Sequence, residues 1–465
     1  MNRQGIIISA LRGGSGKTII SLGVIGALRK NGYTIAPFKK GPDYIDAGWL
    51  ALAANSPCYN LDTYLLSPQI LKHSFLNHSH QKDIIIIEGN RGLYDSIDSE
   101  GSTSTADLSI LLQFPVILVL DCTKTTRTLA AILMGCQLFN PNVQIKGVIL
   151  NQVAGSRHES IITKSIEQYN QIPVLGAIPK LKSNIFPERH MGLIPNQEHD
   201  WADHALEKSI DLIQNYVSLE QLSSIIYSNT TDYDQTDSNK SMSSIINQTK
   251  TQSIRIGIAR DEAFQFYYEE NIDALKQQGA EIIYVSPLND KELPYLDALY
   301  IGGGFPETHA RQLADNILFR KQLYSLAQNN LPIYAECGGL MYMGTHIIVE
   351  GHAYEMCGIF PAQFGLYKKP QGHGYTQFIV DQKNPFYDIG TEIKGHEFHY
   401  SKVIDWQGSD DMIAFQMIRG KGFHNNRDGV WLKNVLGLYT HIHALGTTQW
   451  VNKLIAKAVS HKASQ

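Results

Sequence analysis

The sequence predicts an α/β protein with two domains, and three observations lead to this fold class. Short apolar runs typical of buried parallel strands recur along the chain and end in Gly-rich or acidic loops. Residues 228–252 are rich in Ser, Thr, Asn, Asp and Gln, can bury little surface, and are expected to form a linker. This linker separates a predicted first domain, residues 1–227, from a second domain, residues 253–465, which begins with the strand-like run IRIGIA.

Composition excludes several classes of protein. The 465 residues are 43% hydrophobic and 18% charged with a net charge of −4, so there is no global basic field to attract nucleic acid. Five scattered cysteines without CxxC spacing favour a reducing cytosol over a disulfide framework or zinc ribbon. No stretch has the character of a signal peptide or a membrane span. We therefore expect a cytoplasmic protein that binds neither nucleic acid nor membrane; composition does not indicate its oligomeric state.

The first domain opens with a strand (residues 5–11, GIIISAL), a Gly-rich loop (12–18, RGGSGKT) and a helix (19–30). Such a loop offers N–H groups and the positive end of the helix dipole to a phosphate. Lys17 would reach the β- and γ-phosphates of ATP, and the Thr18 hydroxyl would bind Mg²⁺. The remaining phosphate cradle would consist of Gly13, Gly14, Ser15 and Gly16. The first glycine of the usual GxxxxGK[ST] motif is absent, and a plain flexible turn is the alternative.

Acidic or amide residues follow the other predicted strands of this domain. The run DIIII ends in Glu88, VILVL ends in Asp121, and IKGVIL ends in Asn151. Because ligands of open α/β sheets bind beyond the carboxyl ends of the strands, these side chains would converge near the Gly-rich loop. Glu88 is the better Mg²⁺ candidate, and Asn151 could read a nucleobase edge. For each residue, a solvated strand end is the alternative.

The loop FKKGPDYID, residues 38–46, adds Asp43, Tyr44 and Asp46 to the first domain. Carboxylates three residues apart can share work between a metal and a substrate, whereas a turn with solvated acids is the alternative interpretation. The motifs RGLYD, which ends in Asp95, and PERHMGL place further Arg, His and Asp residues in loops.

In the second domain, PIYAECGGLMYM predicts a strand, a tight turn at Cys337 and a helix. A thiolate is favoured at a helix N-terminus. The alternative is a buried structural cysteine. N–H groups of Gly338, and of Gly303 and Gly304 in the run GGGFPE, could serve as oxyanion donors. The run VLGLY delivers His441 to another strand end as a candidate base, with a structural histidine as the alternative. HEFH lacks the HExxH spacing, which disfavours a zinc site.

Together these motifs resemble the cobyrinate a,c-diamide synthase family over essentially the whole chain apart from the linker. GGGFPE, AECGGLMYM, GHEFHYS and YTHIHA look like its class I glutamine amidotransferase domain. FKKGPDYID, EGNRGLYD and PERHMGL look like its N-terminal domain, which is of dethiobiotin-synthetase type with a deviant P-loop. The resemblance therefore implies a P-loop NTPase-like parallel sheet followed by a flavodoxin-like α/β domain.

The activity that this resemblance implies is a carbon–nitrogen ligase reaction of cobalamin biosynthesis. ATP, Mg²⁺ and L-glutamine would serve to amidate the a and c carboxylates of cobyrinate, a tetrapyrrole polycarboxylate, through acyl phosphates. Nickel-sirohydrochlorin or hydrogenobyrinate are alternative substrates. A non-enzymatic P-loop ATPase switch protein is an alternative of another class, but it has no use for a paired Cys337 and His441.

Carried over by position, the resemblance implies that Cys337 is the glutaminase nucleophile and His441 its base. General class I amidotransferases place a Glu two residues after this histidine, where the present chain has His443, so the third member stays unassigned. In the first domain, the implied metal partners are Thr18, Asp46 and Glu88, and the implied substrate neighbourhood is Asp43, Tyr44 and Asp95.

Overall fold

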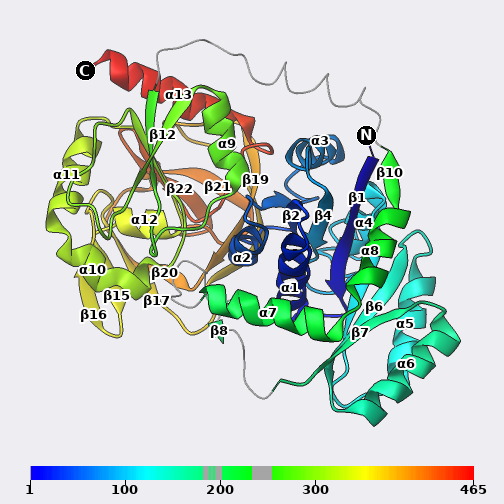
Figure 1. Ribbon diagram of the computed structural model, residues 1–465. Coiled ribbons are helices and arrows are strands. Elements are labelled where there is room, and N and C mark those ends of the chain that lie inside the picture. The colour runs from blue at the N-terminus through cyan, green and yellow to red at the C-terminus, as the bar shows by residue number, and fades with distance from the viewer. Residues whose placement is uncertain (1, 182–187, 190–191, 194–201, 233–253) are drawn as a thin grey trace. The chain divides into compact units, whose positions relative to one another are not determined.

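The computed structural model describes residues 2–181, 188–189, 192–193, 202–232 and 254–465. The chain divides into two compact units, Met1–Ser241 and Met242–Gln465. Each unit is built on a β-sheet with flanking helices (Figure 1), which confirms the predicted α/β fold class. None of the helices in the described ranges is both long and apolar enough to cross a membrane.

The first unit contains a parallel sheet with strand order β3-β2-β4-β1-β5-β6-β7. The apolar strand β1 lies inside this sheet, between β4 and β5. β10 pairs antiparallel with the start of β1, so residues 230–232, which the sequence assigns to the linker, form a strand of the first unit. Residues 233–252 of the expected linker lie outside the described residues.

The strands of the first unit are β1 (Asn2–Ala10), β2 (Ile35–Lys40), β3 (Tyr59–Leu61), β4 (Ile84–Glu88), β5 (Val116–Asp121), β6 (Ile145–Val153), β7 (Val174–Pro179), β8 (Glu188–Arg189), β9 (Gly192–Leu193) and β10 (Thr230–Asp232). Its helices are α1 (Lys17–Lys30), α2 (Ile45–Ala54), α3 (Pro68–His78), α4 (Thr105–Leu112), α5 (Thr128–Phe139), α6 (Ser156–Asn170), α7 (Ala202–Tyr216) and α8 (Leu219–Ser228). The pair β8–β9 holds the described residues of PERHMGL; the rest of that motif lies outside the described ranges.

Helix α1 follows the Gly-rich loop and packs against α2 and α7. Two glycines of α1 permit the close approach of α7. A Cβ on Gly23 would lie 2.3 Å from the carbonyl oxygen of Ser209, and one on Gly26 would lie 2.5 Å from a methyl carbon of Ile210. This packing secures the helix whose first residues are Lys17 and Thr18.

The second unit contains a nine-stranded sheet with order β12-β11-β13-β14-β23-β22-β21-β18-β19. The first five strands in this order are parallel, as the sequence predicts, and the remaining pairs are antiparallel. The sequence does not reveal the antiparallel half, because its strands mix polar and apolar residues and lack a continuous apolar run. A second, four-stranded sheet has the order β16-β15-β17-β20.

The strands of the second unit are β11 (Ile254–Ala259), β12 (Ala280–Val285), β13 (Ala298–Ile301), β14 (Ile333–Glu336), β15 (His346–Val349), β16 (His352–Glu355), β17 (Ala362–Leu366), β18 (Gly372–Val380), β19 (Glu392–His399), β20 (Ser401–Trp406), β21 (Ile413–Arg419), β22 (Arg427–Leu432) and β23 (Val435–Leu438). Its helices are α9 (Glu269–Gln277), α10 (Ala310–Asp315), α11 (Ile317–Gln328), α12 (Gly338–Met343) and α13 (Thr448–Ala463), with 3₁₀ turns η3 (Pro306–His309) and η4 (Asp410–Met412).

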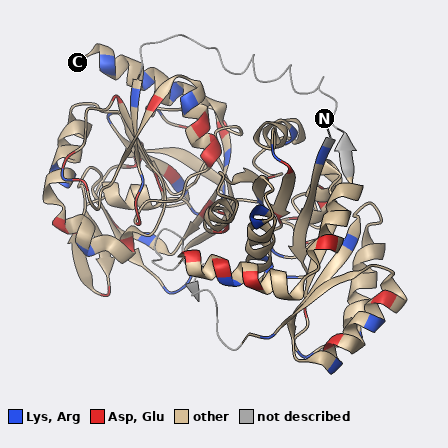
Figure 2. Cartoon of the chain, viewed as in Figure 1, with Lys and Arg blue, Asp and Glu red and all other residues tan. Residues whose placement is uncertain are grey.

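Acidic and basic residues are interspersed on helices of both units, for example along α7 (Figure 2). Helix α5 differs, because its sequence TLAAILMGCQLF contains no charged residue and several of its apolar side chains, including Leu138 and Phe139, are exposed. Gly135 of this helix has free space beside it, because a Cβ added there would come within 4 Å of no described heavy atom apart from those of its chain neighbours and of the helix's own backbone.

The contact between α1 and α7 can be tested with Gly23→Ala. This variant should lower the free energy of unfolding by about 1–3 kcal/mol, because the added methyl group would press on the backbone of α7. Urea denaturation followed by circular dichroism measures the change. Gly135→Ala is the matched control, and it should stabilise the protein by about 0.4–1 kcal/mol because alanine reduces the entropy of the unfolded chain. An unchanged urea midpoint for Gly23→Ala would contradict the close packing of the two helices.

Candidate functional site

The Gly-rich loop of the first unit lies between β1 and α1. Gly14 and Gly16 have φ values of 72° and 84°, in the left-handed region that favours glycine. A Cβ on Gly16 would lie only 2.4 Å from Nδ2 of Asn151, which instead donates a hydrogen bond of 2.9 Å to the carbonyl oxygen of Ser15. Asn151 thus supports the loop in this structure, and its reading of a nucleobase stays a prediction.

Lys17 and Thr18 occupy the first turn of α1 and contact different neighbours. The Lys17 ammonium donates to the carbonyl oxygen of Arg91 at 2.9 Å, beside the RGLYD motif. Burial, together with the charge of Lys39, lowers the pKa of Lys17. The Thr18 hydroxyl donates to Oε1 of Glu88 at 2.8 Å, which brings two of the predicted metal partners together.

Lys39, at the end of β2, is the centre of the carboxylate cluster and was missed as a site residue. Its ammonium lies 2.7 Å from Asp46, 2.9 Å from Glu88 and 3.7 Å from Asp43. Only 2% of the Lys39 side chain is exposed, and that of Glu88 is fully buried. A signal exists in the sequence, because Lys39 directly follows the largely apolar run IAPF, and every residue of this strand is buried in the structure.

These close contacts shift the protonation of the cluster. Burial would lower the pKa of Lys39, but the charges of Asp46 and Glu88 outweigh it and hold that pKa well above its ordinary value. Burial would raise the pKa of Asp46, but the adjacent Lys39 ammonium lowers it. Burial raises the pKa of Glu88. Burial and the neighbouring Asp46 charge raise the pKa of Asp43 to about 7.

The donor set of this cluster fits a hard cation. Thr18, Asp46 and Glu88 offer oxygen atoms, and the buried Oε2 of Glu88 has no hydrogen-bond partner among the described residues. No group of three or more His, Cys, Asp or Glu residues in the described ranges forms a metal cage on its own. Mg²⁺ is commonly held by only one or two carboxylates, with substrate phosphates and water as its other ligands, so this set suits a metal that arrives with a nucleotide.

The predicted substrate residues lie on two loops near this cluster. Asp43 and Tyr44 directly precede α2, and Oδ1 of Asp43 accepts the N–H of Asp46 at 2.9 Å. Asp95 accepts the N–H of Gly92 at 2.8 Å, which fixes the fold of the RGLYD loop. At the neighbouring strand end, Asp121 forms an ion pair of 2.9 Å with Arg12 of the Gly-rich loop.

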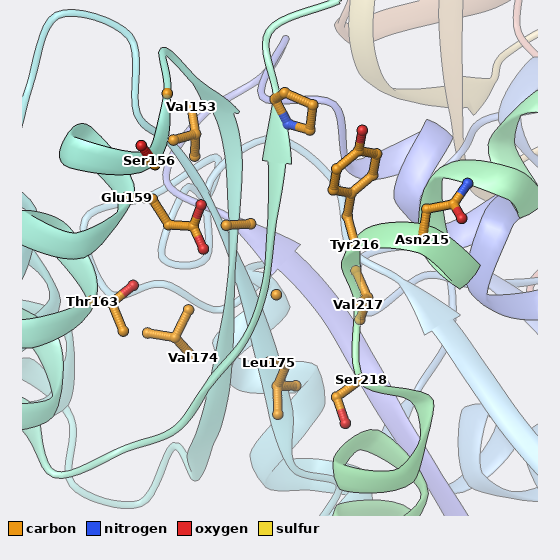
Figure 3. A pocket seen from close by; sticks show the side chains of 14 residues that line it. Val153, Ser156, Glu159, Thr163, Val174, Leu175, Asn215, Tyr216, Val217 and Ser218 are labelled. Carbon is orange, nitrogen blue, oxygen red and sulfur yellow. The ribbon is translucent and has the colours of Figure 1, made fainter.

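A separate open pocket of about 670 Å³ lies elsewhere on the first unit. Figure 3 shows side chains from β6, β7, α6, the end of α7 and the segment after α7 around it. Its lining contains no Lys or Arg and includes none of the predicted site residues. It therefore lacks the cations that would bind a nucleotide phosphate or a polycarboxylate.

In the second unit, Cys337 occupies a sharp turn between β14 and α12. Its φ of 48° and ψ of −99° are unusual for a residue with a side chain and store strain. The Cys337 N–H donates to the carbonyl oxygen of Leu438 at 2.7 Å. A Cβ on Gly338 would lie 3.1 Å from the nitrogen of Gly304, so the glycines after β13 approach the turn closely.

The protonation of Cys337 differs from the expectation of a stabilised thiolate. Burial raises the pKa of the Cys337 thiol, and the nearby negative charge of Glu307 raises it further. Helix α12 contains only six residues, so its dipole offers little compensation. The expectation was wrong for the resting protein, in which the group is a buried thiol that needs a base.

His441 follows β23, the parallel neighbour of β14. The two strands bring the residues after their carboxyl ends together, so Cys337 and His441 lie at the same edge of the sheet. A Cβ on Gly303 would lie 3.2 Å from Nε2 of His441, which places that ring against the glycine loop. The His441 ring stacks on His396 with 5.0 Å between centroids.

Glu336, the last residue of β14, was not identified from the sequence. Its Oε2 lies 3.2 Å from Nδ1 of His441 and accepts the Tyr300 hydroxyl at 3.1 Å. Its Oε1 accepts the N–H of Ile442 at 3.3 Å. An acid at the end of an apolar strand was the signal used for Glu88, and the same signal was present here.

The other histidines near His441 have separate partners. His443 lies 3.7 Å from Glu270 and packs against the ring of Tyr268. In the HEFH motif, His396 Nδ1 lies 3.1 Å from the Tyr268 hydroxyl, whereas Glu397 accepts backbone N–H groups from residues 421 and 422. Burial lowers the pKa of His396 well below its ordinary value, so this ring is neutral.

Comparison with known protein families matches both units. Residues 6–194 match the CobQ/CobB/MinD/ParA nucleotide binding domain, and residues 255–449 match the CobB/CobQ-like glutamine amidotransferase domain. The first unit is therefore a nucleotide-binding domain and the second a glutamine amidotransferase domain.

Curated relatives match the chain over nearly its whole length. Proteins named cobyrinate a,c-diamide synthase are 39% identical in Magnetococcus marinus, covering 96% of this chain and 95% of the relative, and 36% identical in Archaeoglobus fulgidus, covering 98% of both. The protein of the same name in Methanobrevibacter smithii is 36% identical over 97% of this chain and 98% of its own length. The chain therefore belongs to the cobyrinate a,c-diamide synthase family.

Proposed function

We propose that this protein forms the a,c-diamide of cobyrinate in the cytoplasm, taking nitrogen from L-glutamine and energy from ATP. The observation that carries the proposal is Cys337, held at a strained turn with His441 at the end of the neighbouring strand. This arrangement suits nucleophilic attack on an amide. The names of the curated relatives supply the substrate. All five cysteines are free, which agrees with a reducing compartment.

The first unit would activate the carboxylate. Ammonia does not amidate a carboxylic acid at neutral pH, because it removes the proton instead. ATP would convert the carboxylate to an acyl phosphate, from which ammonia displaces phosphate. Lys17 and the N–H groups of the Gly-rich loop would bind the ATP phosphates. The loops that carry Asp43, Tyr44 and Asp95 would contact the substrate.

Thr18, Asp46 and Glu88 are the residues that would hold Mg²⁺, which supplies charge neutralisation at the transferred phosphoryl group when bound. Lys39 would keep the Asp46 carboxylate charged in a buried site and would oppose the effect of burial on Glu88, since an isolated buried carboxylate takes up a proton.

The second unit would release ammonia from glutamine. Sγ of Cys337 attacks the amide carbon while His441 accepts the thiol proton. N–H groups of Gly303, Gly304 and Gly338 would stabilise the oxyanion. His441 then gives the proton to the leaving nitrogen, and a thioester remains. Water hydrolyses the thioester to glutamate and restores the thiol.

The substrate assignment is tested by the product. Incubation with cobyrinate, ATP, Mg²⁺ and glutamine should give a product whose mass reports two carboxyl-to-amide conversions. Nickel-sirohydrochlorin and hydrogenobyrinate are run in parallel, and faster turnover of either one would contradict the assignment to cobyrinate.

The division of labour between the units is tested with Cys337→Ser. This variant should lose glutamine-dependent amidation and keep amidation with added ammonium salt, because serine is too weak a nucleophile here while the ATP site is unchanged. Cys136→Ser is the matched control and should keep both activities, because the contact of this α5 residue with the RGLYD loop is made by its backbone carbonyl, which accepts the Tyr94 hydroxyl, and the substitution leaves that carbonyl in place. Lys17→Ala should lose both nitrogen sources. Glutamine use at the normal rate by Cys337→Ser would rule out this mechanism.

The buried lysine at the carboxylate cluster is tested with Lys39→Met. Removal of one partner from a buried ion pair leaves an uncompensated charge, so the free energy of unfolding should fall by about 3–5 kcal/mol. Lys30→Met is the matched control: its ammonium pairs with Glu207 on the surface, so the loss should be about 0–1 kcal/mol. Urea denaturation compares the two variants, and equal losses would contradict the central place of Lys39.

A further inference from the structure

The Glu336 carboxylate receives three donors in a buried setting. The His441 Nδ1 group and the Tyr300 hydroxyl lie 3.2 and 3.1 Å from Oε2, and the Ile442 N–H lies 3.3 Å from Oε1. The side chains of Glu336 and His441 are 1% and 2% exposed. A buried carboxylate with donors on both oxygens is held in one orientation, and so is the imidazole bound to it.

We propose that Glu336 is the positioning residue of the glutaminase site, which holds His441 in its working tautomer and stabilises the imidazolium that forms during the reaction. This inference rests on the proposed glutaminase function of the second unit. It assigns the carboxylate member of the Cys–His site to the residue directly before the nucleophile.

The chemistry requires a proton on Nδ1. With Nδ1–H donated to Glu336, the Nε2 lone pair of His441 accepts the proton of the Cys337 thiol. The resulting imidazolium carries its positive charge beside the Glu336 carboxylate, and the proton stays on Nδ1 throughout. When Nε2 returns its proton to the leaving nitrogen of glutamine, ammonia departs and the neutral imidazole is restored. No net proton is lost or gained at Glu336.

Because the Cys337 thiol is buried, the stabilisation of the His441 imidazolium by Glu336 matters more. Because the buried Cys337 thiol has a raised pKa, its deprotonation depends on how well the resulting imidazolium is stabilised. His396 stacks on His441 but is neutral and faces the Tyr268 hydroxyl through Nδ1, so it supplies no negative charge. Glu336, by contrast, brings a carboxylate oxygen to within 3.2 Å of Nδ1 of the His441 ring.

The histidine two residues after His441 does not fill this role. His443 occupies the position at which general class I amidotransferases have their Glu, and it lies 3.7 Å from Glu270. The Glu336–His441 pair thus has a buried counterpart in the Glu270–His443 pair, and the side chains of both pairs are at most 2% exposed. The second pair offers a matched control for the first.

The test compares Glu336→Gln with Glu270→Gln in the full-length protein. Glu336→Gln should reduce kcat for glutamine-dependent amidation by about 10²- to 10⁴-fold with little change in KM for glutamine, as when the carboxylate of a catalytic triad is replaced by its amide. Amidation with ammonium salt should stay normal, which reports an intact fold and ATP site. Glu270→Gln should keep both activities near normal.

A second readout follows the thiol itself. The rate at which iodoacetamide alkylates Cys337 is measured against pH, with Cys337→Ser as the blank for other cysteines. Without the carboxylate the thiolate–imidazolium pair is less stable, so the midpoint for Glu336→Gln should move to higher pH by about 1–3 units. A merely structural glutamate would leave this midpoint in place in the folded fraction.

Two results would overturn the proposal: a glutamine-dependent kcat of Glu336→Gln within threefold of normal, or an unchanged alkylation midpoint. If Glu336→Gln does not fold, Glu336→Asp decides, because it keeps the charge but shortens its reach. A lowered kcat with normal KM and a raised midpoint supports the proposal, and normal values reject it. Failure of the glutaminase function itself would appear in the unmodified protein, which would then not use glutamine at all.

Discussion

The hydrogen-bond register between neighbouring parallel strands is the constraint on which both sites depend. In the first unit, β1 and β4 pair so that Ile8 lies opposite Glu88, and the Gly-rich loop therefore begins where that carboxylate ends its strand. In the second unit, Glu336 on β14 lies opposite Leu438 on β23. The carboxyl ends of parallel strands lie at one edge of the sheet, so strand pairing alone brings together residues that are far apart in the sequence.

Each site also buries charge and compensates for it locally. Lys39 brings an ammonium to Asp46 and Glu88, and its 2% exposure leaves these groups to neutralise one another. Glu336 is compensated differently, by donors from a tyrosine, a histidine and a backbone N–H. Burial of an unpaired charge costs several kcal/mol, so both arrangements need nearly complete sets of partners. In both units, the charges are buried at the sites where the proposed chemistry benefits from a low dielectric constant.

Local sequence signals were sufficient for the parallel strands, the Gly-rich loop, the turn at Cys337 and the family. They were insufficient for residues whose role depends on a partner that is distant in the sequence. Lys39 resembles any surface lysine until Glu88, 49 residues later, is seen beside it. Glu336 meets His441 across 105 residues. The thiolate expectation failed for the same reason: burial and the nearby Glu307 charge, which arise from tertiary packing, outweigh a six-residue helix.

Glu336 directly precedes Cys337, so the orientation of its carboxylate and the strained turn at Cys337 depend on the same stretch of backbone. A backbone strained at φ 48° costs about 1–3 kcal/mol and persists only where its surroundings fix it. The Cys337 N–H is held by Leu438 and its carbonyl oxygen by the N–H of Met341, while the preceding side chain is held by three donors. The contacts that fix the carboxylate thus also brace the nucleophile's turn. His441 follows β23, and Leu438 at the end of β23 accepts the Cys337 N–H. The pairing register of β14 with β23 therefore aligns the nucleophile, the base and the carboxylate.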